Sequence, residues 1–313
     1  MSSRLILVTG GLGFIGKHFV ASCLDQGDYV INVDRVNYAA DRVVKCAFKE
    51  KPNYRFMELD VCALDYLPEC DIIVNFAAES HVDNAIADNY KFCRSNIIGV
   101  QHLLELVRNK QEHERPRFVQ ISSDEVYGDC LNGKFTEDDL LRPSNPYSAT
   151  KASADMLVQS WSRTYKIPFN IIRPSNNYGA HQYPEKLIPK SSWRMKRGLP
   201  ALMHGDGTYV RSWLHAEDTV AAIATVLEAG EIDAIYNVSG DLHLRNVEVL
   251  RKIAAILEVP EAEAWMPVAD RSGQDVRYSI DDRRIRALGW RPKRDFEGEL
   301  KTIIHETDFQ RFI

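Results

Sequence analysis

The stretch Leu5–Gly16 reads LILVTGGLGFIG, an apolar run followed by a series of glycines. The run Leu5–Val8 predicts a buried strand, and Gly10, Gly13 and Gly16 stand at three-residue intervals where a helix begins. Small residues there allow a tight turn, a close approach of backbone amides to a pyrophosphate, and close packing of the helix on the strand. We therefore expect a strand–turn–helix that binds a dinucleotide.

Similar apolar runs alternate with helix-period segments along the first half of the chain. Such alternation is typical of a parallel sheet with helices on both faces, so the expected fold class is α/β, a Rossmann-type doubly wound parallel sheet. The predicted strands are Leu5–Val8, Tyr29–Val33, Ile72–Val74, Phe118–Ile121 and Phe169–Ile172, and the clearest helices are Phe14–Leu24, Asn89–Val107 and Tyr147–Tyr165.

Prolines and glycines break the chain into short pieces after Arg173. The segments Ala216–Glu228 and Ile235–Val238 again read as a helix and a strand. We expect a first domain of residues 1–175, rejoined by about 214–239, and a smaller C-terminal α/β lobe of residues 176–313. Further helices are expected at Asn246–Leu257, Asp281–Leu288 and Glu297–Phe309.

Composition narrows the class of protein. The chain has 313 residues, a net charge of -5 and 45% hydrophobic residues, which argues for a folded protein without a nucleic-acid or membrane partner. Its six cysteines stand singly, and no spacing suggests a metal site. The first apolar run is too short for a signal peptide, so we expect a cytoplasmic protein.

Asp34 ends the second predicted strand, where a carboxylate binds adenosine ribose hydroxyls and repels the extra phosphate of NADP. NAD is therefore the expected cofactor, although Arg35 could hold a 2'-phosphate. Asp60 and Val61 are placed to meet the adenine ring, but Asp60 could equally cap a helix.

Tyr147 and Lys151 stand four residues apart and so share one face of a predicted helix. The ammonium is expected to lower the pKa of the phenol and make it a base at neutral pH. Ser123, just after the strand Phe118–Ile121, is expected to hold a substrate hydroxyl. Alone, Tyr-x-x-x-Lys is common in ordinary helices; after a dinucleotide-binding fold it gains meaning.

Together with Asn75-Phe76-Ala77-Ala78, these residues resemble the extended short-chain dehydrogenases/reductases over essentially the full length. The run Ser122–Gly128, SSDEVYG, is similar to the dTDP-glucose 4,6-dehydratase group, whose hallmark is the adjacent Asp124-Glu125 pair. The resemblance implies catalytic roles for Ser123, Asp124, Glu125, Tyr147 and Lys151. It also implies an NAD site made of Gly10, Gly13, Phe14, Ile15, Gly16, Asp34, Asp60, Val61, Ala77, Ala78, Tyr147 and Lys151.

The expected reaction explains the need for two carboxyls. Oxidation at C4 of a nucleotide-linked glucose acidifies the C5 proton, which Glu125 would remove while protonated Asp124 donates to the departing C6 hydroxyl. Hydride return to C6 and reprotonation of C5 by Glu125 then give a 4-keto-6-deoxy sugar and regenerate NAD. Read without the resemblance, the two carboxylates could merely solvate the end of a strand.

The same resemblance implies contacts to the nucleotide sugar. Arg211 suits bidentate contact with a phosphate, and His81 could instead be a packed loop histidine. The expected substrate-binding residues are Glu79, His81, Asn176, Asn177, Lys186, Leu187, Arg211, Asn246 and Gln274.

Several positions depart from the group's pattern: Ser123 for Thr, Asn84 for Arg, His215 for Tyr, Ser272 for Pro and Gln274 for His. Most bear on phosphate and nucleotide binding, so the base, thymine or uracil, stays open. The alternatives are a nucleotide-sugar C4 epimerase or decarboxylase of the same family, and a non-catalytic NAD-sensing protein. By analogy we expect a homodimer through helices Asn89–Val107 and Tyr147–Tyr165.

Overall fold

The computed structural model describes residues 3–306 and 309–312. Its main sheet has seven parallel strands in the order β10-β6-β5-β4-β1-β2-β3. Starting from β1, the chain adds strands first on one side, as far as β3, and then on the other side, as far as β10, as in a doubly wound fold. The strands are β1 (Leu5–Thr9), β2 (Tyr29–Asp34), β3 (Tyr54–Glu58), β4 (Ile72–Asn75), β5 (Arg117–Ile121), β6 (Phe169–Pro174) and β10 (Ala234–Val238). The predicted fold class is confirmed.

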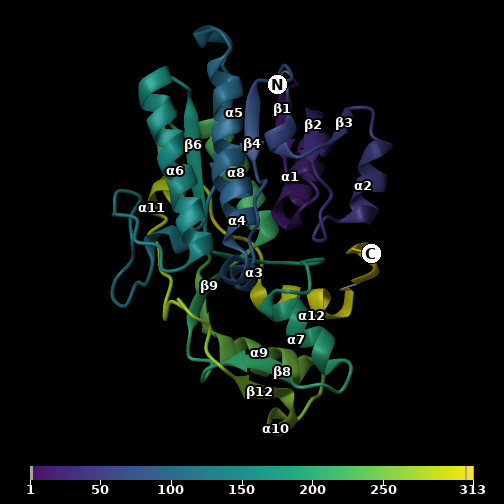
Figure 1. Cartoon of the computed structure of the whole chain (residues 1–313). Coiled ribbons are helices and arrows are strands. Elements are labelled where there is room, and N and C mark those ends of the chain that lie inside the picture. The colour runs from purple at the N-terminus through teal and green to yellow at the C-terminus, as the bar shows by residue number, and fades with distance from the viewer. Residues whose placement is uncertain (1–2, 307–308, 313) are drawn as a thin grey trace.

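Helices cover both faces of this sheet (Figure 1). One face packs against α1 (Phe14–Asp25) and α8 (Ala216–Ala229), and its core includes Phe19 and Ile223. The other packs against α5 (Gly99–Arg108) and α6 (Pro146–Tyr165) through residues such as Leu103 and Val158. The inner strands β1, β4, β5 and β6 are apolar on both faces because helices cover them on both sides, whereas the edge strand β3 is partly exposed.

The predicted helix Asn89–Val107 is continuous but not uniform. It runs through α4 (Asn89–Phe92), a π-helical segment η2 (Cys93–Ile98) and α5. A π segment adds a residue to the turn and so redirects the side chains around it. Here the buried Asn96 bonds both to the Glu79 backbone and to the Thr150 hydroxyl on α6.

The helix α6 begins where its sequence allows a cap. Asn145 and Ser148 form a reciprocal capping box, and Pro146 occupies the first turn, where its missing N–H costs nothing. The helix ends at Lys166, which adopts a left-handed φ of 60°. These signals fix where Tyr147 and Lys151 stand relative to the sheet.

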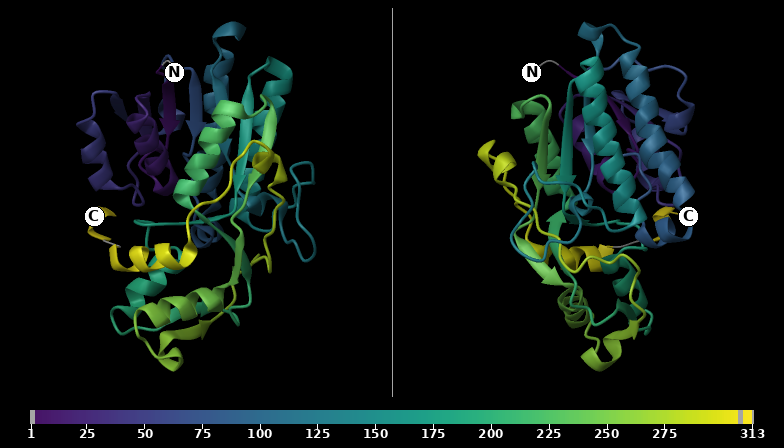
Figure 2. Two further views of the ribbon diagram at one scale, coloured as in Figure 1. Left: turned by 180° about the vertical axis from the view of Figure 1, so that it is seen from behind. Right: turned by 60° about the vertical axis from the view of Figure 1, so that its left-hand side comes forward.

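The smaller C-terminal lobe lies below the main sheet in Figure 2. It has a small hydrophobic core of its own. It contains the three-stranded sheet β11-β9-β7 and the pair β12-β8, with helices packed beside them. Its elements are β7 (Asn176–Tyr178), α7 (Leu187–Met195), β8 (Ala201–His204), β9 (Val210–His215), β11 (Leu242–Arg245), α9 (Asn246–Ile256), α10 (Glu261–Ala264), β12 (Trp265–Val268) and α12 (Phe296–Glu306).

The chain crosses between the two parts more than once. After β9 it returns through α8 to β10, which pairs with β6 at the edge of the main sheet. The domain division at residue 175 stays a prediction. The short elements α2 (Arg42–Lys49), α3 (Val82–Ala87), α11 (Arg283–Ala287), η1 (Val61–Ala63), η3 (Glu112–Glu114), η4 (Asp124–Tyr127) and η5 (Phe309–Phe312) complete the fold.

Two helix boundaries differ from the sequence prediction. The helix expected at Asp281–Leu288 is the shorter α11, because the Asp281 carboxylate accepts the backbone N–H of Arg283 and holds the chain in a turn just before the helix. The helix expected at Glu297–Phe309 is α12 up to Glu306, and residues 307–308 of that prediction lie outside the described residues. Across the described ranges, no helix is long and apolar enough to span a membrane.

Candidate active site

A cavity of about 300 Å³ opens at the carboxyl ends of the main-sheet strands, where the C-terminal lobe meets them. It brings the predicted catalytic and cofactor-binding residues together. Those among its lining residues are Gly10, Gly13, Phe14, Ile15, Gly16, Asp34, Asp60, Val61, Ala77, Ala78, Ser123, Asp124, Glu125, Tyr147 and Lys151. Asn176, Asn177 and Lys186 line it from the substrate side.

The glycine turn leaves room for a phosphate. Gly10 has φ of +69°, and a Cβ built there would lie 2.7 Å from the backbone nitrogen of Ala77. A Cβ on Gly16 would lie 2.4 Å from the carbonyl oxygen of Gly10. No side chain caps α1 at Gly13, so its first N–H groups stay free for an anion. The turn therefore fits the pyrophosphate of a dinucleotide.

The adenosine end is lined by charged groups that hold one another. Asp34 accepts the backbone amides of Leu12 and Val36 at 3.0 and 2.8 Å. Arg35 is paired with Glu79 and lies 3.5 Å from Asp60. Because two carboxylates already engage this guanidinium, it is poorly placed to receive a 2'-phosphate, which supports the NAD prediction.

Asp60 has the capping role that the sequence left open. Its Oδ1 accepts the N–H of Cys62 at 2.9 Å at the start of η1. The residue also lines the cavity, so capping does not remove it from the cofactor side. A contact of Asp60 and Val61 with adenine stays a prediction.

Tyr147 and Lys151 lie buried beside the end of β5. The Lys151 ammonium donates to the Ile121 carbonyl at 2.5 Å, and burial lowers its pKa to about 8. Burial, and then the charge of Glu125, raise the pKa of Tyr147 far above its usual range. The expected lowering of the phenol pKa is therefore not produced by the protein's own groups, because desolvation and the nearby carboxylate charges outweigh the hydrogen bond from Ser123.

The adjacent carboxyls occupy η4 directly after β5. Burial, and then the charge of Glu125, raise the pKa of Asp124 to about 8, and burial also raises the pKa of Glu125. Within the described ranges, Asp124 Oδ2 has no hydrogen-bond partner. A buried carboxyl that stays protonated at neutral pH is suited to act as a general acid.

The C-terminal lobe contributes positively charged side chains near these carboxyls. The buried Arg211 on β9 donates to the carbonyls of Val210 and Asp275 and stacks on the Tyr278 ring, 4.2 Å from its centroid. Its charge and that of Lys186 both act to lower the pKa of Glu125. Lys186 in turn donates to the Ser80 carbonyl at 2.8 Å.

The two asparagines of the substrate segment differ in what they can offer. The side-chain amide of Asn177 forms its hydrogen bonds within the protein: its oxygen accepts from the Thr219 hydroxyl at 2.7 Å, and its nitrogen donates to the Ser175 carbonyl at 2.9 Å. Asn176 Oδ1 is buried without a hydrogen-bond partner among the residues described. Asn176 is therefore the one whose side-chain oxygen remains available to a substrate donor.

Arg211 and the remaining predicted substrate residues lie outside the cavity lining. Glu79 is held by Arg35, and His81 precedes α3, with its Nε2 3.6 Å from Asp83. Leu187 and Asn246 are the first residues of α7 and α9, and Gln274 lies in the loop after β12. Their contacts with a nucleotide sugar stay predictions.

Two residues near Glu125 were missed by the sequence analysis. The Asn145 amide and the Tyr278 hydroxyl each lie 3.4 Å from Glu125 Oε2. Asn145 precedes Pro146 as a helix cap, a signal that could have placed it beside Tyr147. Tyr278 carries no such signal, because it reaches the site only through the tertiary fold.

The fold and the site define an extended short-chain dehydrogenase/reductase. The sequence model described as GDP-mannose 4,6 dehydratase matches residues 7–303. The chain belongs to this family.

Individual relatives are similar over nearly the whole chain. The low-salt glycan biosynthesis protein Agl12 of Haloferax volcanii is 44% identical, with 96% of this chain and 97% of that protein covered. The dTDP-glucose 4,6-dehydratase of Haemophilus influenzae is 39% identical, with 96% of each covered. The predicted enzyme class, a hydro-lyase like the dTDP-glucose 4,6-dehydratases, is confirmed.

Solved structures agree with the fold. DesIV, a dTDP-glucose 4,6-dehydratase from Streptomyces venezuelae with NAD and TYD bound, has a TM-score of 0.91, 38% identity and 96% coverage of each chain. The UDP-glucuronic acid 4-epimerase of Bacillus cereus has a TM-score of 0.90 at 22% identity, with 96% of this chain and 98% of that chain covered, and shows the shared fold alone. The NAD prediction agrees with the cofactor in the DesIV structure.

Proposed function

We propose that this chain is an NAD-dependent nucleotide-diphospho-glucose 4,6-dehydratase, acting on dTDP-glucose or UDP-glucose to give the 4-keto-6-deoxy sugar and water. The observation that carries this proposal is the Asp124-Glu125 pair, with Asp124 buried and Glu125 half-buried, in the same cavity as Tyr147 and Lys151. An epimerase that only inverts C4 has no step that requires a second protonated carboxyl. In this protein, burial favours the neutral form of Asp124.

The glycine turn, Asp34 and the cavity wall at Ala77 and Ala78 would hold NAD. When bound, NAD supplies the acceptor for the C4 hydride and later the donor for C6. Tyr147 is the proposed acceptor of the C4 hydroxyl proton, since the Ser123 hydrogen bond and the positive charge that NAD+ would bring both oppose the rise of the Tyr147 pKa. The Ser123 hydroxyl would hold the same substrate oxygen.

Glu125 and Asp124 then divide the elimination. Glu125 removes the C5 proton, and Asp124 gives its proton to the departing C6 hydroxyl, which leaves as water. Glu125 afterwards returns a proton to C5. The charges of Arg211 and Lys186 oppose the burial that raises the Glu125 pKa, and so favour the ionised form that its first step needs.

The nucleotide diphosphate would lie along the substrate lobe. Arg211 and Lys186 supply positive charge, and Asn176 a free amide oxygen. Glu79, His81, Asn177, Leu187, Asn246 and Gln274 remain proposed contacts of the nucleotide sugar.

The test is turnover with product identification. Purified protein is incubated with NAD and, separately, with dTDP-glucose and UDP-glucose, while the alkaline absorbance of 4-keto-6-deoxy sugars and product mass are followed. Loss of one water, abolished in Glu125→Gln and kept in the control Glu105→Gln on α5, supports the proposal and identifies the nucleotide. Unchanged mass with an inverted C4 centre means an epimerase, and no turnover despite NAD binding means a sensor.

We further propose a homodimer through the α4, η2 and α6 surface. Tyr90, Ile98 and Met156 lie there with 77, 50 and 61% of their surface exposed, unusual for large apolar side chains. A second copy with the same surface would cover them. Light scattering should report a dimer, and Met156→Glu should shift it to a monomer; a wild-type monomer at high concentration contradicts the proposal.

The location is expected to be the cytoplasm. All six cysteines are free in the structure, which fits a reducing compartment. Fractionation of the native host followed by immunodetection tests this.

A further inference from the structure

Arg173, at the end of β6, is among the largest fully buried side chains of the protein. Its Nε donates to Asp155 Oδ2 at 2.9 Å, and its Nη1 donates to the Tyr127 hydroxyl at 2.6 Å. The guanidinium also lies over the Tyr127 ring, 4.9 Å from its centroid. A charge this deeply buried is tolerated only when it is well paired and bonded.

The partners of Arg173 belong to the two elements that carry the proposed catalytic groups. Asp155 lies on α6, one turn after Lys151 and two turns after Tyr147. Tyr127 is the last residue of η4, which begins with Asp124 and Glu125. The Arg173 guanidinium therefore connects α6, which carries Tyr147 and Lys151, to η4, which carries the two proposed carboxyl groups.

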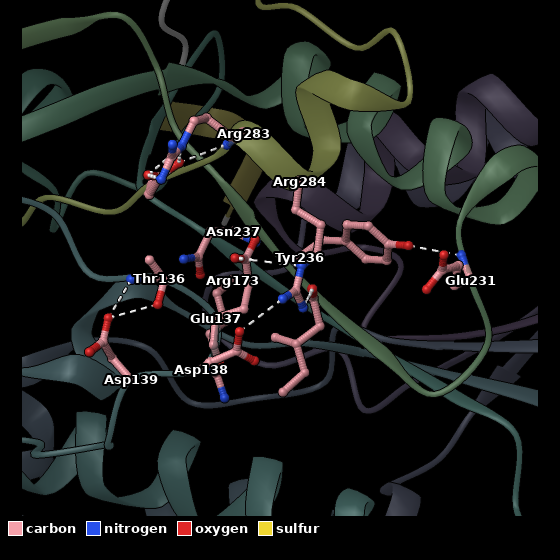
Figure 3. Close-up of polar contacts among 12 residues, drawn as sticks. Thr136, Glu137, Asp138, Asp139, Arg173, Glu231, Tyr236, Asn237, Arg283 and Arg284 are labelled. Atoms are coloured by element: carbon pink, nitrogen blue, oxygen red, sulfur yellow. Dashed lines mark hydrogen bonds and ion pairs between the residues drawn. The ribbon is translucent and has the colours of Figure 1, made fainter.

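The far side of this connection is braced against the sheet edge. Tyr127 donates to Asn237 Oδ1 at 2.9 Å, and the Asn237 backbone donates to Glu137 Oε1 at 2.9 Å. Figure 3 shows Arg173, Asn237, Glu137 and Arg284 gathered there, with Arg284 Nε 3.8 Å from Glu137 Oε2. Tyr127 thus has little freedom to move away from Arg173.

Asp155 also faces the lysine electrostatically. The charged and titratable groups around Lys151 are Tyr147 and Asp155 on its own helix, Arg173 on β6, and Asp124 and Glu125 on η4. Of these, Asp155 is the carboxylate whose charge opposes the loss of the Lys151 proton. The i,i+4 spacing puts the two side chains on one face of α6.

We propose that Asp155 and Arg173 are positioning residues. Their ion pair ties the helix of Tyr147 and Lys151 to the turn of Asp124 and Glu125, and the Asp155 carboxylate keeps the Lys151 ammonium charged during turnover. The inference rests on the proposed dehydratase function and deepens its account of that site.

The test compares three variants by pH–kcat profile and by thermal unfolding. Asp155→Asn keeps the shape and removes the charge. Asp155→Asn/Arg173→Met removes both charges, and the matched control Asp28→Asn breaks another buried carboxylate–arginine pair, to Arg4, at the opposite end of β1. In Asp155→Asn the alkaline limb of kcat should move to lower pH by about one unit, because a lost neighbouring anion disfavours the ammonium. In the double variant the shift should be smaller, because the Arg173 cation is lost as well. The control should not move it.

Stability supplies a readout that needs no turnover. Asp155→Asn should lower Tm more than Asp28→Asn, because it leaves the Arg173 charge buried and unpaired, and the double variant should recover part of that loss. An unmoved alkaline limb in folded Asp155→Asn, or a Tm loss no greater than in the control, would overturn the inference. Wild-type protein inactive on both sugars would instead refute the proposed function, while the Tm comparison still decides whether the tie exists.

Discussion

Asp124→Asn should make the protein more stable and nearly inactive. The pKa of Asp124 is raised from 3.8 to about 8, first by burial and then by the charge of Glu125. Folding therefore favours the protonated carboxyl. The contribution of this group to stability is fully present below pH 4 and is lost as the pH rises through about 8.

The size of the effect at neutral pH follows from that shift. At pH 7 the folded carboxyl must hold a proton about three pH units above its unfolded pKa, which costs about 4 kcal/mol at about 1.4 kcal/mol per unit. Asparagine carries no such cost, but its amide would face the atom position that lacks a hydrogen-bond partner in the described structure. An unsatisfied buried amide costs about 1–3 kcal/mol, so we expect a net gain of about 1–3 kcal/mol at pH 7.

Urea unfolding of both proteins at pH 5, 7 and 8.5 measures this. The stability advantage of Asp124→Asn should grow with pH up to about 8, while kcat falls by about 10²–10⁴-fold because the general acid is gone. Asp25→Asn, which makes the same change at an exposed carboxyl at the end of α1, serves as the control and should show no pH-dependent advantage. An Asp124→Asn advantage that is absent or independent of pH would refute the reasoning.

Three further variants test other parts of the site. Tyr147→Phe should lower kcat by about 10²–10⁴-fold with little change in Tm, since only the proton acceptor is lost; initial rates with a parallel melt check this, and retained activity would exclude Tyr147 as the base. Gly16→Ala should weaken NAD binding in a calorimetric titration, because its Cβ would lie 2.4 Å from the Gly10 carbonyl oxygen, while Gly298→Ala, with its nearest neighbour at 3.3 Å, should bind normally. Arg271, in the loop after β12, forms a 2.5 Å ion pair with Asp83 on α3 and so joins the C-terminal lobe to the main domain. Arg271→Ala should therefore raise KM by about two- to fivefold with kcat unchanged, and an unaltered KM at low salt would show that this pair does not contribute to substrate binding.

Much of the fold and part of the site followed from local patterns. The glycine spacing after β1 and the Tyr147–Lys151 spacing are contacts within one turn or one helix, so residue order alone decides them. The π segment in the helix after Asn89 was not predicted, because its apolar period changes little when one residue is added to a turn. The strands of the substrate lobe were likewise missed, since each is short and pairs with a distant segment.

The sequence by itself determined the doubly wound sheet and the cofactor turn, and it predicted which side chains react. Only the tertiary structure decided their electrostatics: burial raises the pKa of Tyr147, where a lowering was expected, and raises the pKa of Asp124 to about 8. The tertiary structure also placed Arg211 of β9, Arg173 of β6 and Tyr278 of the segment after β12 near the site. Desolvation and long-range pairing depend on which chain segments exclude water together, and no local spacing of residues encodes that.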